Sequence, residues 1–309
     1  MIQGMKPPLI AIVGPTAVGK TEISIQLAER LGGEIVSADS RLFYRGMDIG
    51  TAKPTLEERA RVPHHLIDVV DPDGTCNLAV FQHMAADAIA DVQRRKKLPL
   101  LVGGTGQYIH AVMYGWAPPP SKPDDHLRKI LNEQAAANGN EWLHRRLAYL
   151  DPRAAQSIDP HNLRRTVRAL EVIFSTGRRF SDQRGQGESP YRLMTIGLIR
   201  PRTELYARVD VRIEAMFASG LLNEVSNLLE RGYSTDLPTM SAIGYRECAA
   251  VLRGEMSLEE AKVQMRRLTR NFVRRQANWF KQEDANIQWF HAGKNNLDEM
   301  EKQIRMFLG

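Results

Sequence analysis

The residues with the clearest chemical potential lie near the N-terminus of the 309-residue chain, in a short segment with two glycines, a lysine and two threonines. It reads Gly14-Pro15-Thr16-Ala17-Val18-Gly19-Lys20-Thr21 and matches the phosphate-binding pattern GxxxxGK(S/T). The glycines allow backbone amides to wrap a phosphate, Lys20 adds positive charge, and the Thr21 hydroxyl is a ligand for Mg²⁺. We therefore predict a polyphosphate site with Mg²⁺ as cofactor, in preference to a tight turn that binds nothing.

Two further polar groups close apolar runs that are typical of buried strands. Asp39 ends the run EIVSAD, and Gly103-Gly104-Thr105-Gly106 closes the run LPLLVG. Because the carboxyl ends of neighbouring parallel strands share a crevice, we expect Asp39 and Thr105 to lie beside the bound phosphates. Asp39 would serve there as a general base or as a partner of Mg²⁺. The alternatives are that Asp39 caps the next helix together with Ser40, and that the glycine-rich segment is a plain turn.

Strands and helices alternate through the first third of the chain. Short apolar runs typical of strands occur at 9–14, 34–39, 65–70 and 98–103. Apolar residues at helical spacing occur over 20–31, 77–97 and 106–115. This alternation predicts an α/β fold with a doubly wound parallel sheet of the P-loop NTPase kind.

The pattern changes after residue 116. The segment APPPSKP at 117–123 predicts a stiff hinge, because successive prolines suit neither a helix nor a strand. Helical patterns follow to about 188, a strand returns at 192–200, and the chain from 203 onward is mostly helical in character. We therefore predict an α/β core of residues 1–120 and 191–309 with a helical C-terminal part, and an inserted helical domain of residues 121–190.

Composition narrows the class of protein. Hydrophobic residues make up 43% of the chain and charged residues 25%, which is typical of a globular protein rather than a disordered or fibrous one. The two cysteines, Cys76 and Cys248, are far apart, which favours a reducing compartment and argues against a disulfide scaffold. No apolar run reaches membrane-spanning length, so we expect a cytoplasmic protein without membrane contact.

The net charge of +6 is unevenly distributed. Residues 1–120 have a net charge of 0, residues 121–200 of +5, residues 201–281 of +3, and the tail from 282 of −2. An excess of positive charge in the middle of the chain favours a polyanionic partner for that part. The alternative is the mild basicity that many proteins share.

The phosphate-binding segment does not define the reaction. The chain has no NKxD motif of the kind that GTPases use, and LPLLVGG ends in glycines rather than in the acidic pair of a motor ATPase. Two enzyme classes remain, a kinase of the nucleotide-kinase kind and a transferase with diphosphate as leaving group. An RNA-binding regulatory module with a phosphate switch is the third possibility.

Five segments in this order resemble the signatures of tRNA dimethylallyltransferases, also called tRNA isopentenyltransferases. They are GPTAVGKT, VSADSRLFYRGMDIGTAKP, VGGTGQY, NLRRTVRALEV and SAIGYRE, and the likeness covers roughly residues 9–280. The resemblance implies transfer of a dimethylallyl group from dimethylallyl diphosphate to N6 of the adenosine at tRNA position 37, 3′ to the anticodon, with release of diphosphate. It implies a Mg²⁺-dependent enzyme of bacterial type, without the zinc-finger extension of eukaryotic relatives, and we expect a monomer.

The resemblance also implies roles for individual residues. Asp39 matches the catalytic aspartate, which takes the proton that the adenine amine loses on attacking the allylic carbon. Arg208 and Arg212, four residues apart, match positions that face the diphosphate. Thr105, in the glycine-rich segment, matches a residue of the channel where donor and adenine meet. The alternative for each arginine is an ion pair with Glu204 or Asp210. The expected catalytic set is Asp39, Lys20, Thr105, Arg208 and Arg212.

The target adenine must leave the stacked anticodon loop, so an enzyme of this kind has to hold the RNA backbone. The clearest basic feature is the predicted helix 261–282, which holds seven Lys and Arg residues and no acidic residue. The alternative for this run, and for the arginines of NLRRTVRALEV, is a solvated helix face. The residues expected to contact tRNA are Asp39, Ser40, Arg41, Leu42, Thr105, Arg128, Arg164, Arg165, Arg168, Ser241, Gly244, Tyr245, Arg246, Arg266, Arg270 and Arg274.

Overall fold

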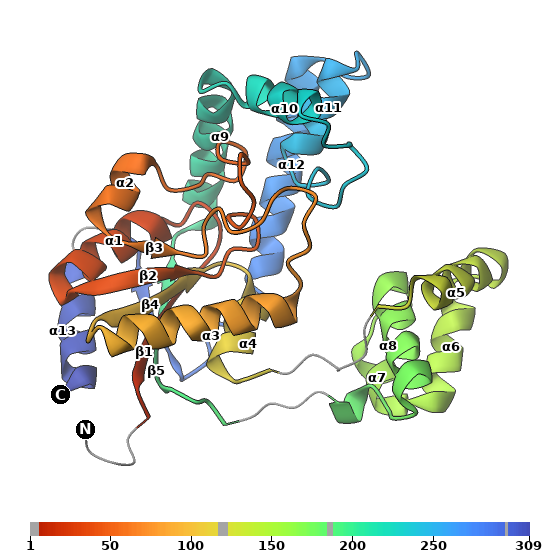
Figure 1. The fold of residues 1–309 in the computed structure, drawn as a ribbon, viewed down its shortest axis with the longest axis horizontal. Helices are drawn as coiled ribbons and strands as arrows, with labels where there is room; N and C mark the ends of the chain where they lie inside the picture. Colours follow the sequence, from red (N-terminus) through yellow and green to blue (C-terminus); the bar gives the residue numbers. More distant parts are fainter. Residues whose placement is uncertain (1–5, 117–122, 184–187, 294–295) are drawn as a thin grey trace. The chain divides into compact units, whose positions relative to one another are not determined.

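The computed structural model describes residues 6–116, 123–183, 188–293 and 296–309. The chain divides into two compact units, one of Met1–Met113 with Ser189–Gly309 and one of Tyr114–Glu188 (Figure 1). The insertion expected from the sequence, residues 121–190, begins and ends later than the second unit. The predicted hinge at 117–123 lies almost entirely outside the described residues.

The larger unit is built on a parallel sheet with the strand order β3-β2-β4-β1-β5-β6. The strands are β1 (Pro8–Val13), β2 (Gly33–Ser37), β3 (His64–His65), β4 (Leu98–Gly103), β5 (Arg192–Ile199) and β6 (Ile287–His291). β1 lies between β4 and β5 and is buried along nearly its whole length, as expected for a strand that is covered on both faces. The predicted α/β fold with a parallel sheet is confirmed.

Helices cover both faces of this sheet, because parallel strands are joined by right-handed crossovers. Figure 1 shows α1 and α3 on opposite faces, and α9 and α12 side by side. The helices are α1 (Lys20–Leu31), α2 (Leu56–Arg61), α3 (Leu78–Arg94), α4 (Gly106–Met113), α9 (Arg202–Ala218), α10 (Leu221–Glu230), α11 (Tyr245–Leu252), α12 (Leu258–Gln276) and α13 (Leu297–Leu308). Across the ranges that the structure describes, no helix is long and apolar enough to cross a membrane.

The smaller unit is helical and has its own core. Its elements are α5 (Asp125–Asn138), α6 (Asn140–Leu150), α7 (Pro152–Ser157), α8 (Leu163–Thr176) and a 3₁₀ turn at Ser181–Gln183. Leu143, Leu147 and Leu170 are among the side chains of the core. The buried carboxylate of Asp151 accepts hydrogen bonds from the Ala154 amide and from the Ser181 amide and hydroxyl, and so ties α7 to the 3₁₀ turn.

The structure differs from the sequence-based prediction at two strands. The strand expected at 65–70 shortens to β3, because Leu66 and Asp68 adopt left-handed backbone angles (φ 62° and 57°). The amides of Val69 and Val70 donate to the Phe43 carbonyl instead of continuing the sheet. The prediction also missed β6, an edge strand of half-buried and exposed residues that therefore lacks a continuous apolar run.

Candidate active site

A cavity of about 580 Å³ opens at the carboxyl ends of β1, β2 and β4, within the larger unit. Segments far apart in the chain contribute to its wall: the P-loop (14–21), the turn 39–42, the loop 50–52, α9, the segment 241–246 and α12. The apolar residues that α9, α12 and the segment 241–246 contribute to the wall are Val209, Ile213, Met216, Ala242, Ile243, Met265, Leu268 and Phe272. The cavity therefore combines a phosphate-binding loop with an apolar wall.

The P-loop surrounds the ammonium group of Lys20. Lys20 Nζ donates to the carbonyl oxygens of Gly14 and Pro15, each at 2.9 Å. A Cβ at Gly14, whose φ is +152°, would lie 2.7 Å from the Leu198 carbonyl oxygen, so this position requires glycine. Burial lowers the pKa of Lys20 to about 8, while the neighbouring carboxylate of Asp39 opposes that shift. Lys20 is therefore mostly cationic at neutral pH and lies near an acidic group.

Two arginines bind backbone carbonyls of the P-loop. Arg208 Nε donates to the Ala17 carbonyl at 2.7 Å, and Arg200 Nε donates to the Val18 carbonyl at 2.8 Å. Because both carbonyls are bound by side chains of the protein, the loop is held in shape before any ligand arrives. Arg200 lies in none of the sequence motifs, although its place directly after β5, next to β1 in the sheet, could have indicated it.

Glu204 and Asp210, the acidic residues named as alternative partners for Arg208 and Arg212, bind other arginines instead. Glu204 is bound by Arg200, and Asp210 accepts a hydrogen bond from Arg270 at 2.6 Å. Arg212 lines the cavity. Burial and the neighbouring arginine of α9 lower its pKa, as expected for cations gathered at an anion site. The alternative in which Glu204 or Asp210 neutralises these arginines is therefore wrong.

Asp39 lies two residues beyond the end of β2, on the wall of the cavity. Its Oδ1 accepts a hydrogen bond from the Arg41 amide at 3.1 Å, and the residues that follow form a turn rather than a helix. The alternative of a helix cap shared with Ser40 is therefore wrong. The carboxylate is close enough to influence the pKa values of both Lys20 and Arg212, so acid and cations share one end of the cavity.

Gln276, at the end of α12, links the P-loop to the glycine-rich turn after β4. Its Oε1 accepts a hydrogen bond from the Thr16 amide at 2.8 Å, and its Nε2 donates to the Gly104 carbonyl at 3.1 Å. A Cβ on Gly104 would lie 2.4 Å from that Nε2, so glycine permits this contact. Thr105, which was expected in the channel, directly precedes α4 and is not among the residues that line the cavity. No motif in the sequence indicates Gln276.

We expect Gln276→Ala to weaken diphosphate binding and lower the melting temperature, because the Thr16 amide and the Gly104 carbonyl lose their partner. Each buried polar group left without a partner costs about 1–3 kcal/mol. Titration calorimetry with inorganic diphosphate and a thermal scan measure both effects. Gln264→Ala is the matched control, since Gln264 lies on the same helix and makes only a 3.5 Å contact with Glu247. Equal diphosphate affinity in the two variants would contradict the role of Gln276.

The chain is similar to known proteins over most of its length. A family model described as IPP transferase matches residues 42–283, and one described as isopentenyl transferase matches residues 7–68. A tRNA dimethylallyltransferase of Roseiflexus sp. (strain RS-1) is 57% identical over 274 residues, which cover 89% of this chain and 90% of the relative. The chain belongs to the tRNA dimethylallyltransferase family.

Solved structures of the family share this fold. The full-length tRNA isopentenylpyrophosphate transferase of Bacillus halodurans is 42% identical, with a TM-score of 0.74 and coverage of 98% of this chain and 97% of that one. A eukaryotic dimethylallyltransferase described as acting on tRNA is 26% identical, with a TM-score of 0.80 and coverage of 97% of this chain and 77% of that one. The family fold therefore extends over nearly the whole chain.

In this family member, five of the residues expected to contact tRNA line the cavity: Asp39, Arg41, Leu42, Ser241 and Arg246. The Arg246 guanidinium forms a 2.8 Å ion pair within its own helix turn and remains half exposed. Ser40 is half-buried beside them but is not part of the cavity lining. Two well-separated segments of the sequence thus meet at the cavity wall.

Two other residues expected to contact tRNA have structural roles in this family member. Tyr245 is fully buried, and its hydroxyl donates to Glu224 at 2.6 Å, so the expectation that its side chain contacts RNA is wrong. Gly244 precedes α11 with a φ of +98°, and its amide donates to the Glu247 carboxylate at 2.8 Å. The contacts of both residues therefore stabilise the conformation of the segment 241–246.

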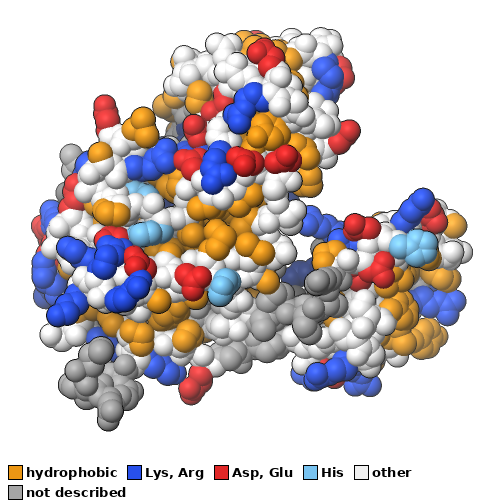
Figure 2. All heavy atoms as spheres, in the orientation of Figure 1, with side chains coloured by type: hydrophobic (Ala, Val, Ile, Leu, Met, Phe, Trp, Pro, Cys, Tyr) orange, Lys and Arg blue, Asp and Glu red, His pale blue; other side chains and the backbone are white. Residues whose placement is uncertain are grey.

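The basic run of α12 is partly neutralised by α9. Arg266 pairs with Glu214, and Arg270 pairs with Asp210 at 2.6 Å. The run itself contains no acidic residue, and the carboxylates that pair with it come from α9. Arg274, by contrast, is exposed. Figure 2 shows acidic and basic side chains interspersed on the visible face of the molecule.

The four arginines of the smaller unit that were expected to contact tRNA fall into two kinds. Arg128 and Arg168 both bind the Glu171 carboxylate, whose side chain is 0% exposed, at 2.8 and 2.6 Å. These two cations are therefore held by the fold of the helical unit. Arg164 and Arg165 are exposed on the first turn of α8.

Proposed function

We propose that the protein transfers a dimethylallyl group from dimethylallyl diphosphate to N6 of the adenosine at tRNA position 37 and releases diphosphate. One observation carries the proposal. A single cavity brings together the P-loop with its cations, an apolar wall and the Asp39 carboxylate. A phosphate site beside an apolar wall suits an allylic diphosphate, and a carboxylate beside both suits a reaction that releases a proton.

The diphosphate would occupy the P-loop end of the cavity. The P-loop amides, Lys20, Arg208 and Arg212 provide positive charge where negative charge develops on the departing oxygen. The dimethylallyl group would lie against the apolar side chains of α9 and α12, which exclude water from the allylic carbon.

The exocyclic amine of adenine is a weak nucleophile and sheds a proton when it reacts. As the bond between N6 and the allylic carbon forms, the bond between that carbon and the diphosphate oxygen breaks. Asp39 accepts the proton from N6, which leaves a neutral secondary amine on the base. Asp39 lines the same cavity as the P-loop and the segment 241–246, which supports this role.

We propose Mg²⁺ as the cofactor. The Thr21 hydroxyl lines the cavity, and the described part of the chain holds no cluster of three or more His, Cys, Asp or Glu side chains for a metal. This sparse donor set fits Mg²⁺, which is commonly held by few side chains together with phosphate oxygens and water. When bound, Mg²⁺ would offset part of the diphosphate charge.

The adenine must be extruded from the anticodon loop to reach the cavity. We propose that Arg41, Leu42, Ser241 and Arg246 receive the extruded base at the cavity wall. Exposed arginines of α12 and α8 would contact phosphates of the RNA backbone. We place this activity in the cytoplasm, where tRNA is found, and propose that the enzyme acts as a monomer.

The direct test combines the protein with labelled dimethylallyl diphosphate, Mg²⁺ and unmodified tRNA, followed by nucleoside analysis. We expect N6-dimethylallyladenosine and released diphosphate only when donor and tRNA are both present. A transcript with guanosine at position 37 is the matched control. Consumption of ATP with a small acceptor would identify a kinase instead, and RNA binding without diphosphate release would identify a binding module.

The end of α12 offers a separate prediction about tRNA affinity. We expect replacement of both Arg274 and Arg275 by alanine to weaken tRNA binding and to lower the slope of log affinity against log salt by about one to two, because each lost phosphate contact contributes about 0.7–0.9. Binding titrations at several salt concentrations measure this slope. Arg94→Ala, at an exposed arginine of α3, is the control. An unchanged slope would remove the end of α12 from the RNA footprint.

A further inference from the structure

The carboxylate of Glu224, on α10, binds the loop that contains residues 48–50. Oε2 accepts hydrogen bonds from the Asp48 amide at 2.9 Å and the Ile49 amide at 2.7 Å. Oε1 accepts from the Gly50 amide at 3.2 Å and from the Tyr245 hydroxyl at 2.6 Å. One acidic side chain thus holds three consecutive backbone amides and a buried phenol.

The packing around this carboxylate leaves little freedom. A Cβ on Gly50 would lie 2.5 Å from the Tyr245 ring, so the loop backbone rests directly on that ring. Burial and the adjacent Glu224 raise the pKa of Tyr245, which keeps its hydroxyl protonated and able to donate. The two partners therefore stabilise one arrangement of the loop.

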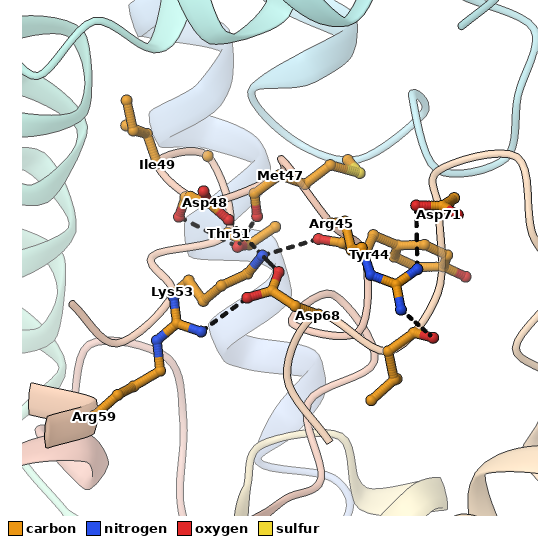
Figure 3. A network of polar contacts seen from close by, with 12 residues as sticks. Tyr44, Arg45, Met47, Asp48, Ile49, Thr51, Lys53, Arg59, Asp68 and Asp71 are labelled. Atoms are coloured by element: carbon orange, nitrogen blue, oxygen red, sulfur yellow. Dashed lines mark hydrogen bonds and ion pairs between the residues drawn. The ribbon is translucent and has the colours of Figure 1, made fainter. Parts of the chain in front are cut away.

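Lys53, at the end of the same loop, provides a second anchor. The Lys53 side chain is 1% exposed, and its Nζ donates to the Tyr44 carbonyl at 2.8 Å and to Asp68 at 2.6 Å (Figure 3). The ammonium group also pairs with Asp48, and Arg59 binds the second oxygen of Asp68 at 2.8 Å. Lys53 and Glu224 therefore both hold loop 48–52, Lys53 through the Asp48 side chain and Glu224 through backbone amides.

The loop held in this way forms part of the cavity wall. Gly50, Thr51 and Ala52 line the cavity together with the P-loop residues and Asp39. Ala52 adopts a left-handed backbone angle of +52°, so the loop follows a path that it would readily leave if its anchors were lost. Glu224 itself is not among the residues that line the cavity.

We propose that Glu224 is a positioning residue for the transfer reaction, which holds loop 48–52 as a fixed wall of the cavity without touching either substrate. This inference rests on the proposed function. Fixing the wall limits the orientations of the bound donor, and loss of alignment slows a reaction far more than it weakens binding.

The test is the isosteric variant Glu224→Gln, because an amide NH₂ group would face backbone donors that need an acceptor. We expect kcat to fall by about tenfold or more, with KM for the donor and Kd for tRNA changed by less than about threefold. Hydrogen–deuterium exchange of the peptide that covers residues 47–53 should become faster, while peptides of β1 and β4 stay protected. Tyr245→Phe, which removes a single donor, should give a smaller change of the same kind.

Glu230→Gln is the matched control, since Glu230 lies on the same helix and binds only the Ser226 hydroxyl, at 2.9 Å. It should behave as the wild type in every measurement. Unchanged exchange at residues 47–53 in Glu224→Gln, or unchanged kcat despite faster exchange, would overturn the proposal. If the wild type itself fails to modify tRNA, the proposed function fails, and the exchange measurement still decides whether Glu224 holds the loop.

Discussion

Replacing Asp39 with asparagine is expected to lower the rate of dimethylallyl transfer by about 10²- to 10⁴-fold, because general-base catalysis contributes a factor of that size. Asparagine keeps the shape of the side chain and can still accept the hydrogen bond from the Arg41 amide. It cannot take the proton that N6 must lose. The loss should therefore fall on the chemical step, with the turn at 39–42 intact.

Single-turnover transfer and tRNA binding, measured on the same preparations, separate these two effects. We expect the Kd for tRNA to change little in Asp39→Asn while the single-turnover rate collapses. Asp87→Asn serves as the control, since Asp87 is an exposed carboxylate on α3, with its side chain 70% exposed. A variant at Asp39 that turns over at a near-normal rate would exclude this residue as the base.

Replacing Lys20 with methionine is expected to reduce kcat/KM for the donor by about 10²- to 10³-fold, the usual cost of losing one preorganised group that stabilises developing charge. The wild type should also show a pH dependence, because the pKa of Lys20 is lowered to about 8. Below that pH the group is cationic, and above it the group becomes neutral. We therefore expect kcat/KM to be level near pH 7 and to fall about tenfold per pH unit well above pH 8.

The variant Lys20→Arg distinguishes charge from other causes, since a guanidinium stays protonated through this range. Its residual activity should lack the fall above pH 8. Lys97→Met, at an exposed lysine outside the site, should show the wild-type rate and the wild-type pH profile. If kcat/KM of the wild type for the donor stayed level up to pH 9.5, the protonation of Lys20 would not control this parameter.

The parts of the site that the sequence could predict are those set by local backbone rules. The P-loop pattern, the start of α1 at Lys20 and the run that forms β4 depend on glycine placement and apolar periodicity within a few residues. The meeting of Asp39 with the P-loop follows from the geometry of parallel strands, which brings their carboxyl ends to one edge. These features needed no knowledge of distant contacts.

The parts that could not be predicted depend on partners far away in the chain. Gln276 reaches the Thr16 amide from 260 residues away, and Glu224 reaches the Ile49 amide from 175 residues away. Neither residue lies in a pattern whose spacing indicates a contact, because a side chain that binds backbone amides needs only the right position in space. Tyr245 shows that a motif can also mislead, since it belongs to a segment expected to contact RNA and yet its side chain is fully buried.

Helix α9 carries charges of opposite sign on different faces. Arg208 and Arg212 face the cavity, whereas Asp210 and Glu214 accept the arginines of α12. The arginines of α12 that pair with α9 therefore help to hold the fold, whereas the arginines on the cavity face of α9 remain available to bind an anion. A count of basic residues, or a net charge of +6, measures the two together. The positive potential at the cavity depends on which face of α9 carries its arginines. Two sequences of equal net charge that differ in this arrangement would therefore attract an anionic substrate differently.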